Sequence, residues 1–520
     1  MNAHVRRLWI GGVVLAVGVM ATPAWAEDPY ELDWASQIGT SGDDVSRSVA
    51  VDGLGNAWIS GYTDDSLGGS GAGSYDAFLS KFDAAGNHLW SQQLGTVTSD
   101  RSSSVTVDGL GNAYISGETS GSLGGPHAGG SDIFLSKFDS DGNELWSQQI
   151  GTTGRDESVG VAVDGLGNIY ISGTTEGSLG GPGAGGFDAF LFKFDGDGNQ
   201  LWSQQFGTSS FDWSYSVAVD SVGNSYVSGW TRGSLGGPNA GSADAFLSKF
   251  DTDGNHLWSQ QIGTSDYDQS NSVAVDGLGN AYISGPTLGS LGAPNAGDWD
   301  AFLSKFDANG NHLWSQQIGT SGRDQSWSVA VDGLGHAYIS GVTDGTLGGS
   351  GFGSYDAFLS KFDAAGSHLW SQRRGPSTYV FRQSVAVDGL GNAWISGYTG
   401  GSLGGPNAGG NDAFIAKFSA ANPDGDANFD GTVNALDLSI LGVNWLAAVG
   451  GGSADGDFNA AGTVNALDLS ILGSNWLVGA SDGGMSFNDA IATMPLGGIP
   501  EPASLGLLGA GCLFLMRRRR

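Results

Sequence analysis

Short apolar runs alternate with turn-forming residues along most of the chain, and the same pattern returns several times. One copy contains four such runs, at residues 89–94, 105–108, 113–117 and 132–139. Clusters of Gly, Asn and Asp bound the runs, and no helical periodicity lies between them. Each copy is therefore predicted to form four short β-strands.

The copies follow one another with a period of 56 residues, as from Trp34 to Trp90, without insertion or deletion. All seven lysines of the chain fall at one position of the repeat. The tryptophans that mark the period are Trp34, Trp90, Trp146, Trp202, Trp258, Trp314 and Trp370. Four strands in each of seven units predict an all-β fold, a seven-bladed β-propeller with four-stranded blades.

The phase of the repeat predicts how the ring closes. The chain begins on the strand that holds Trp34 and leaves on the strand at 412–418, so the last copy has only three strands of its own. We expect residues 34–39 to supply the missing outer strand of the seventh blade. Closure of this kind leaves no long exposed edge.

The connecting segments sort onto two faces, and the copies diverge on one of them. There, in the segments that lead into each blade, two equivalent positions vary most. The pairs are Val45 and Arg47, Arg101 and Ser103, Glu157 and Val159, Trp213 and Tyr215, Gln269 and Asn271, Gln325 and Trp327, and Phe381 and Gln383. We expect an exposed rim that binds a sugar or a peptide. The candidate ligand-binding residues are Arg47, Arg101, Trp213, Tyr215, Gln269, Asn271, Trp327 and Phe381. Variation without function in solvent loops is the alternative.

Repeated polar residues have simpler explanations than catalysis. The Asp of each Asp-Gly-Leu-Gly-Asn turn is expected to cap its hairpin rather than to join a ring of carboxylates. A second repeated Asp, such as Asp44, is replaced by Val380 in the last copy, which favours a role in a turn. His88, His256, His312 and His368 are expected to be solvated strand residues. No nucleophile motif occurs, and no carboxylate pair is singled out for glycoside hydrolysis, so we predict no catalytic residue.

The composition limits the class of protein further. Acidic residues outnumber basic ones by 53 to 21, which argues against nucleic acid as a partner. The single cysteine, Cys512, excludes a disulfide scaffold. Arg6 and Arg7, an apolar run at 8–20 and Ala24-Trp25-Ala26 predict a signal peptide that ends at residue 26.

A second, shorter repeat follows residue 421 and has the spacing of a calcium loop. Oxygen-bearing side chains stand at loop positions 1, 3, 5, 9 and 12, a glycine at position 6, and position 7 offers a backbone carbonyl. The predicted Ca²⁺ ligands are Asp426, Asn428, Asp430, Thr432, Asn434 and Asp437. The second loop has Asp457, Asn459, Thr463, Asn465 and Asp468. Because Ala461 replaces a ligand there, we expect this site to be weaker or empty.

The C-terminal end has three parts. Pro500-Glu501-Pro502 precedes a mostly apolar run at 503–516, and four arginines end the chain. The run is shorter than the roughly 20 residues of an ordinary spanning helix, but the arginines are a positive-inside signal. A short transmembrane helix is predicted here, which would attach the protein to the membrane before processing.

These three patterns resemble known families. The motif at 273–285, VAVDGLGNAYISG, and its copies resemble the SBBP-type β-propeller repeat, and the paired loops resemble the dockerin type I repeat. The tail is similar to the PEP-CTERM sorting signal. The resemblance implies calcium binding, cohesin-like docking, an exosortase-type peptidase, and export to the envelope or extracellular matrix of a Gram-negative bacterium. Ala435 and Leu436 stand where dockerins often carry hydroxyl residues that contact cohesin.

The chain is thus expected to contain a signal peptide (1–26), a propeller (27–421), a dockerin-like module (422–480), a linker (481–499) and a sorting signal (500–520). The leading hypothesis is an exported, non-catalytic binding or scaffold protein at the cell surface or in its polysaccharide matrix. One alternative is a component of polysaccharide degradation, with a carbohydrate-binding or hydrolytic propeller. Another is a purely structural spacer.

Overall fold

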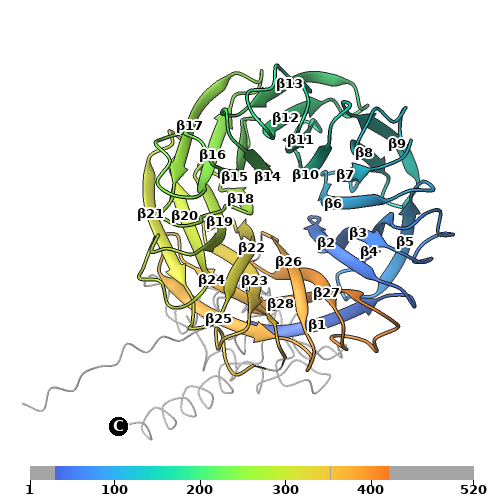
Figure 1. The fold of residues 1–520 in the computed structure, drawn as a ribbon. Helices are drawn as coiled ribbons and strands as arrows, with labels where there is room; N and C mark the ends of the chain where they lie inside the picture. Colours follow the sequence, from blue (N-terminus) through green and yellow to red (C-terminus); the bar gives the residue numbers. More distant parts are fainter. Residues whose placement is uncertain (1–29, 352, 390, 421–520) are drawn as a thin grey trace, which may run out of the picture.

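The computed structural model describes residues 30–351, 353–389 and 391–420, which form a closed ring of β-sheets around a central channel (Figure 1). Within these ranges no helix is long and apolar enough to cross a membrane. The predicted signal peptide, calcium loops, linker and C-terminal helix lie outside the described residues. The seven-bladed, all-β prediction is confirmed, because seven four-stranded sheets surround the channel.

Blades 1 to 6 are antiparallel sheets whose strands follow chain order from the channel outward. Blade 1 has β2 (Asp44–Val51), β3 (Ala57–Thr63), β4 (Asp76–Phe82) and β5 (His88–Leu94). Blade 2 has β6 (Asp100–Val107), β7 (Ala113–Thr119), β8 (Asp132–Phe138) and β9 (Glu144–Ile150). Blade 3 has β10 (Asp156–Val163), β11 (Ile169–Thr175), β12 (Asp188–Phe194) and β13 (Gln200–Phe206). Blade 4 has β14 (Asp212–Val219), β15 (Ser225–Thr231), β16 (Asp244–Phe250) and β17 (His256–Ile262). Blade 5 has β18 (Ser272–Val275), β19 (Ala281–Thr287), β20 (Asp300–Phe306) and β21 (His312–Ile318). Blade 6 has β22 (Asp324–Val331), β23 (Ala337–Thr343), β24 (Asp356–Phe362) and β25 (His368–Arg374).

Blade 7 combines the two ends of the described chain. It contains β26 (Val380–Val387), β27 (Ala393–Thr399) and β28 (Asp412–Ala420), and β1 (Tyr30–Ile38) pairs antiparallel with β28 as its outer strand. The predicted closure is confirmed, although the strand begins four residues before Trp34. The Tyr30 hydroxyl bonds the Tyr338 hydroxyl at 2.9 Å and the Gly391 carbonyl, so it links blades 6 and 7.

The innermost strands begin earlier than the sequence pattern predicts, and this corrects the placement of the variable residues. In blade 2 the strand starts at Asp100 rather than at residue 105, because polar and apolar residues mix in its first half. The two variable positions of a blade therefore lie on, or in blade 5 directly before, the strand that lines the channel. They are not in exposed rim loops, and Val45 and Gln383 are only 3% and 2% exposed.

The apolar core lies between blades rather than within them. One cluster joins Trp58 and Leu79 of blade 1 to Ile115 and Phe134 of blade 2, all of them fully buried. Similar clusters join the other neighbouring blades, including blade 7 to blade 1 through Trp394 and Phe78. Each blade thus completes the core of the next, which is the physical reason that the ring must close.

The repeated lysines form hydrogen bonds between neighbouring blades. Lys81 lies over the Trp58 ring of its own blade, 4.7 Å from the ring centroid, and its Nζ donates to the Ser140 carbonyl of blade 2 at 2.9 Å. Lys137 makes the equivalent bond to the Gly196 carbonyl of blade 3. Lys193, Lys249 and Lys305 make the same contact with the next blade, whereas Lys417 pairs with Asp33 of the strand that closes blade 7, at 3.2 Å. A bond to the neighbouring blade thus explains why lysine recurs at this position of the repeat.

Several repeated polar residues are structural, as predicted. The Asp52 carboxylate accepts the backbone N–H groups of Leu54 and Asn56 at 2.9 and 2.8 Å, so it caps its hairpin turn. The histidines that follow the outer turns are exposed, and the His88 ring nitrogen contacts the Ser91 hydroxyl at 2.8 Å. Neither set points to a ligand.

Candidate binding site at the channel mouth

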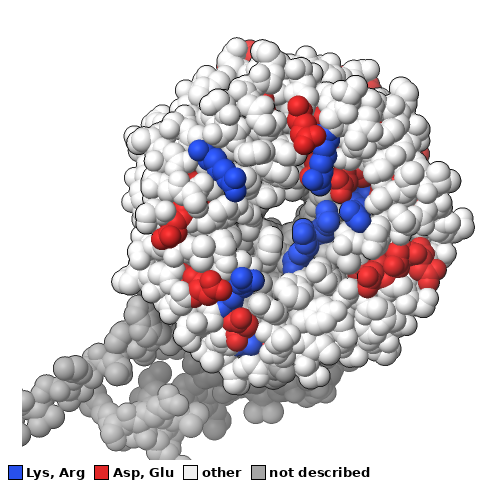
Figure 2. All heavy atoms as spheres, in the orientation of Figure 1, with Lys and Arg blue, Asp and Glu red and all other residues white. Residues whose placement is uncertain are grey.

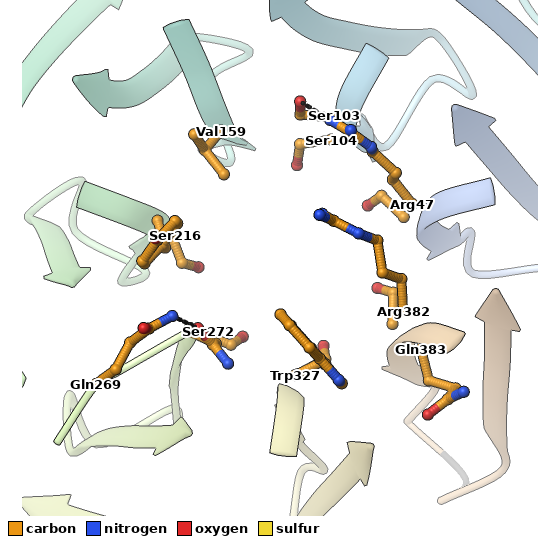
Figure 3. Close-up of a pocket in the computed structure, with 15 residues that line it drawn as sticks. Arg47, Ser103, Ser104, Val159, Ser216, Gln269, Ser272, Trp327, Arg382 and Gln383 are labelled. Carbon is orange, nitrogen blue, oxygen red and sulfur yellow. Dashed lines mark hydrogen bonds between the residues drawn. The ribbon is translucent and has the colours of Figure 1, made fainter. Parts of the chain in front are cut away.

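A cavity of about 370 Å³ opens where the inner strands reach the variable face, and all seven blades contribute to it. We call it the mouth cavity. Its lining residues are Arg47, Ser48, Ser103, Ser104, Val159, Tyr215, Ser216, Gln269, Asn271, Ser272, Trp327, Ser328, Arg382, Gln383 and Ser384. Figure 2 shows basic side chains gathered beside the central opening, and Figure 3 shows the cavity from close by.

The two variable positions of each blade differ in their strand pairing. A register shift between Ser46 and Ser48 leaves Arg47 unpaired, as a β-bulge that presents it to the channel. The residues at the repeat position of Arg47 in the other blades also line the cavity. The other variable position pairs with the second strand, as Arg101 does with Glu118. Of the predicted binding residues, Arg47, Tyr215, Gln269, Asn271 and Trp327 line the cavity, whereas Arg101, Trp213 and Phe381 lie outside its lining.

Blade 7 presents its inner residues differently. Its register shift spans Phe381 to Ser384 and leaves both Arg382 and Gln383 unpaired. Arg382 has a φ of 50° and is the one non-glycine residue with positive φ among the described ranges. Its guanidinium lies over the Trp327 ring, 5.8 Å from the centroid. Sequence comparison of the copies missed Arg382, because serine stands at this repeat position in all six other copies.

Aromatic side chains form a continuous cluster beside the cavity across blades 3, 4 and 5. Trp213 has its ring centroid 4.7 Å from that of Phe187 and 6.1 Å from that of Trp230, with the two indoles nearly parallel. Tyr267 joins Trp230 at 5.9 Å and Trp299 at 5.6 Å. We call these rings, with Phe211, the aromatic cluster; Phe211 is 41% exposed, and Trp230 is the most buried.

The cluster reaches the cavity through one residue. The Trp230 indole donates to the hydroxyl of Tyr215 at 3.3 Å, and Tyr215 lines the cavity. A ligand in the mouth could therefore continue over the aromatic cluster without crossing a polar gap. Planar rings in such a row suit the apolar faces of sugar rings.

The second strands and their following loops supply much of this cluster, and the sequence comparison overlooked them. Trp230 lies on β15, and Phe187 and Trp299 precede the third strands of their blades. A signal was available, because the repeat positions of Trp230 and Phe187 also vary between copies. Strand pairing is what brings them beside the inner strand, as in the Trp213 and Trp230 pair.

Two other variable residues, Arg101 and Phe381, already contact side chains of the propeller. Arg101 lies over the Tyr75 and Tyr62 rings, at 4.5 and 5.2 Å, and pairs with Glu118 at 3.6 Å. Phe381 packs among tyrosines of blades 6 and 7, with Tyr355 at 4.9 Å. These contacts hold Arg101 and Phe381 in place between neighbouring blades. Arg101 and Glu118 also line a separate cavity of about 370 Å³ with Arg155, outside the mouth cavity.

The opposite face is chemically repetitive. The tips of its inner hairpins carry an exposed apolar residue in each copy that the structure describes. These are Leu54, Leu110, Leu166, Val222, Leu278 and Leu334. Because this face presents leucine, or valine in blade 4, at the same place in each of these copies, the variable face is the better candidate for selective recognition.

An acidic pair sits between blades 2 and 3. Burial, and then the nearby charge of Glu118, to which it is hydrogen-bonded, raise the pKa of Glu157 to about 7, against the opposing effect of Arg155. Two carboxyl groups in hydrogen-bond contact are closer than the roughly 5 Å or more that glycoside hydrolysis requires. The pair therefore does not fit the arrangement of a glycosidase.

The raised pKa predicts that stability falls as pH rises. The folded state holds the Glu157 proton up to about pH 7, whereas a glutamate in the unfolded chain loses it near its ordinary pKa of 4.5. Between these values the unfolded state binds fewer protons, so the free energy of unfolding decreases by about 1–3 kcal/mol. Urea unfolding at pH 5 and pH 8 should show this decrease in the wild type and a smaller one in Glu157→Gln. An equal pH dependence in both proteins would contradict it.

No group of three or more His, Cys, Asp or Glu side chains that could hold a metal occurs within residues 30–351, 353–389 and 391–420. The predicted calcium ligands, Asp426 to Asp437 in the first loop and Asp457 to Asp468 in the second, lie outside the described residues.

Comparison with protein families identifies the parts of the chain. Residues 33–68, 89–124, 145–180, 201–236, 257–292 and 313–349 match the SBBP β-propeller repeat. Residues 424–477 match the dockerin type I domain, and residues 498–520 match the PEP-CTERM protein-sorting motif. The chain is therefore an SBBP-repeat propeller protein with a dockerin type I domain and a PEP-CTERM motif.

The two C-terminal families have general properties. Dockerin type I domains typically bind calcium, and such a domain implies a cohesin partner. A PEP-CTERM motif implies processing by an exosortase and sorting to the cell surface.

Individual relatives match only parts of the chain. The regulatory protein FlaEY of Caulobacter vibrioides is 29% identical over 235 residues, which are 40% of this chain and 23% of FlaEY. The WD repeat-containing protein L264 of Acanthamoeba polyphaga mimivirus is 25% identical over 196 residues, which are 29% of this chain and 14% of L264. The chain thus spans less than a quarter of the length of either relative. A protein of unknown function from Dyadobacter fermentans has a solved structure that covers 75% of this chain and 99% of its own, with 11% identity and a TM-score of 0.42.

Proposed function

We propose that this protein is an exported, surface- or matrix-associated binding protein whose propeller recognises an extracellular polysaccharide at the variable face. The observation that supports this most is the aromatic cluster, which continues into the mouth cavity through Tyr215. Rings in a row beside amide and hydroxyl groups provide stacking surfaces and hydrogen bonds together, as sugar recognition requires.

The two ends of the chain support an extracellular location. A signal peptide at 1–26 would direct export, and the PEP-CTERM motif would then deliver the protein to an exosortase-type peptidase at the membrane. The apolar run at 503–516 would span or enter the membrane only before this processing. A Gram-negative cell surface or its polysaccharide matrix is the proposed destination.

The dockerin module would add a second, calcium-dependent contact. Asp426, Asn428, Asp430, Asn434 and Asp437 provide side-chain oxygens, and Thr432 a backbone carbonyl, which fits the hard-oxygen preference of Ca²⁺. The second loop has only a partial set, with Ala461 in place of a ligand. Because Ala435 and Leu436 replace residues that often contact cohesin, we propose a cohesin-like partner that recognises an apolar surface.

The test is polysaccharide binding by the full chain. Affinity electrophoresis and calorimetry against purified neutral and acidic polysaccharides should reveal saturable binding to at least one of them. Trp213→Ala removes the ring between Phe187 and Trp230, and should weaken this binding by about 2 kcal/mol, roughly thirtyfold in Kd.

Two matched variants control the result. Trp213→Phe keeps a ring at the same place and should retain most of the affinity. Leu166→Ala, at a residue 90% exposed on the opposite face, should leave it unchanged. Absence of saturable binding to every polysaccharide, or equal affinity in Trp213→Ala, would reject the proposal and favour a structural spacer.

A further inference from the structure

Two arginines from neighbouring blades meet in the mouth cavity. Arg47 extends from β2 of blade 1 and Arg382 from β26 of blade 7, and both line the cavity. In Figure 3 their side chains reach into the same space, above the Trp327 ring. The Arg47 guanidinium donates one hydrogen bond, from Nη1 to the Ser103 hydroxyl at 3.2 Å.

Like charges are held together here at an energetic cost. Burial, and then the nearby charge of Arg382, lower the pKa of Arg47. The carboxylate that opposes these effects is Glu118, which already pairs with Arg101 at 3.6 Å. Burying a cation beside a second cation is unfavourable unless an anion completes the site. The excess of positive charge is local, because the chain as a whole carries a formal charge of −32.

The cavity also contains unused hydrogen-bonding groups. Arg47 Nε, Trp327 Nε1 and both side-chain amide atoms of Gln383 are buried and have no hydrogen-bond partner. The Arg382 guanidinium contacts the Trp327 ring and makes no hydrogen bond or ion pair within residues 30–351, 353–389 and 391–420. Buried polar groups normally find partners, so the buried donors Arg47 Nε, Trp327 Nε1 and Gln383 Nε2 indicate a missing acceptor. Arg382 itself is exposed at the mouth, where its guanidinium is accessible to a ligand.

The backbone is strained so that Arg382 is presented. Its φ of 50° is unfavourable for a residue with a Cβ, and it lies inside the two-residue irregularity of β26. A regular β-strand at this position would keep φ negative and leave the backbone unstrained. Strained residues of this kind are concentrated at ligand-binding sites.

We propose that an anionic group, a carboxylate or a sulfate, binds between Arg47 and Arg382 in the mouth cavity. The polysaccharide recognised by the propeller is then an acidic one, and this step rests on the function proposed above. Guanidinium groups bind such oxyanions through paired, charge-assisted hydrogen bonds. The bound anion would separate the two cations and accept from the donors that have no partner in the protein.

The experiment measures anion binding by calorimetry with the full chain at about 0.15 M salt, where long-range attraction is screened. The probes are polygalacturonate with its methyl ester, dextran sulfate with dextran, and inorganic sulfate as a free anion. We expect saturable binding of at least one charged polymer, and at least about tenfold weaker binding of its neutral counterpart.

The variant is Arg47→Gln combined with Arg382→Asn, because asparagine tolerates the left-handed conformation that Arg382 adopts. It should bind the charged polymer at least about tenfold more weakly. It should also unfold at the same or a higher temperature, since the repulsion is removed. A structural arginine would behave in the opposite way and lower the unfolding temperature.

The control is Arg323→Gln, which removes the same charge from an exposed pair with Asp298 that does not line the cavity. Its affinity should equal that of the wild type. Equal affinity of the double variant, or no preference for charge, would overturn the anion site. Binding of inorganic sulfate but of neither charged polymer would overturn the polysaccharide assignment. Binding of a neutral polysaccharide that depends on Trp213 and not on the arginines would reject this inference and keep the proposed function.

Discussion

Deleting residues 30–38 is expected to abolish the closed propeller. These residues form β1, the outer strand of blade 7, and without it the edge of β28 is exposed along its whole length. The loss also removes Tyr30, which packs 4.7 Å from the Trp370 ring and bonds the Gly391 carbonyl. An exposed edge that carries buried apolar residues such as Phe414 promotes association with other chains. Size-exclusion chromatography and thermal unfolding should show aggregates and no cooperative transition.

A repaired variant separates closure from simple loss of residues. Residues 83–94 form the outer turn and outer strand of blade 1, and Phe418 occupies the repeat position of Phe82. Copying residues 83–94 directly after Phe418, in the chain that lacks residues 30–38, gives blade 7 a strand joined in the usual order. This variant should be monomeric and unfold cooperatively. A monomeric, cooperatively unfolding protein without any such repair would contradict the closure argument.

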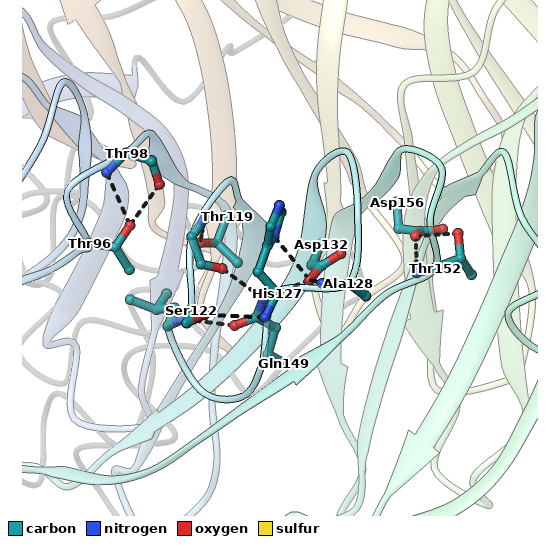
Figure 4. Close-up of polar contacts among 12 residues, drawn as sticks. Thr96, Thr98, Thr119, Ser122, His127, Ala128, Asp132, Gln149, Thr152 and Asp156 are labelled. Carbon is teal, nitrogen blue, oxygen red and sulfur yellow. Dashed lines mark hydrogen bonds and ion pairs between the residues drawn. The ribbon is translucent and has the colours of Figure 1, made fainter.

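Asp156→Val should destabilise the propeller by about 4 kcal/mol, because it leaves several buried donors without an acceptor. The Asp156 carboxylate accepts the Thr152 N–H at 2.5 Å and the Thr152 hydroxyl at 2.8 Å (Figure 4). It also accepts the Thr175 hydroxyl of the next strand. Asp156 is fully buried, so water does not replace these bonds. The midpoint of urea unfolding provides the measurement.

Blade 7 shows how the loss can be compensated. There Val380 replaces the aspartate and Pro376 replaces the threonine, so the acceptor and the N–H donor are absent together. The remaining hydroxyl, of Thr399, donates to the Tyr379 carbonyl at 2.8 Å instead. Thr152→Pro combined with Asp156→Val should therefore cost less than the sum of the two single changes, by at least about 1 kcal/mol.

The reciprocal change tests the same pairing from the other side. Val380→Asp places a carboxylate at a fully buried position where Pro376 offers no N–H, so it should also be destabilising. Strict additivity in the double variant, or a neutral effect of Val380→Asp, would show that these residues are not coupled.

The repeat made the fold predictable, but the sequence pattern led to a wrong location for the variable residues. Strong apolar runs fix the second and third strands of each blade, whereas the first half of the inner strand alternates Ser with variable residues and reads as a loop. The pairing Asp100 with Thr119 and Arg101 with Glu118, which extends that strand, is a tertiary contact across the blade. The prediction of an exposed rim was wrong for this reason, although five of its eight residues line the mouth cavity.

The sequence by itself determined the number of blades, their strand order, the closure by the first strand and the identity of the C-terminal modules, because each depends on local periodicity or on a contiguous motif. Only the tertiary structure decided which variable residues meet. Arg47 and Arg382 are far apart in the chain and occupy different positions of the repeat, and a β-bulge in one blade and a strained irregularity in another turn them toward one cavity. Ring closure places the first and last blades side by side, so this site exists only when the whole propeller has formed.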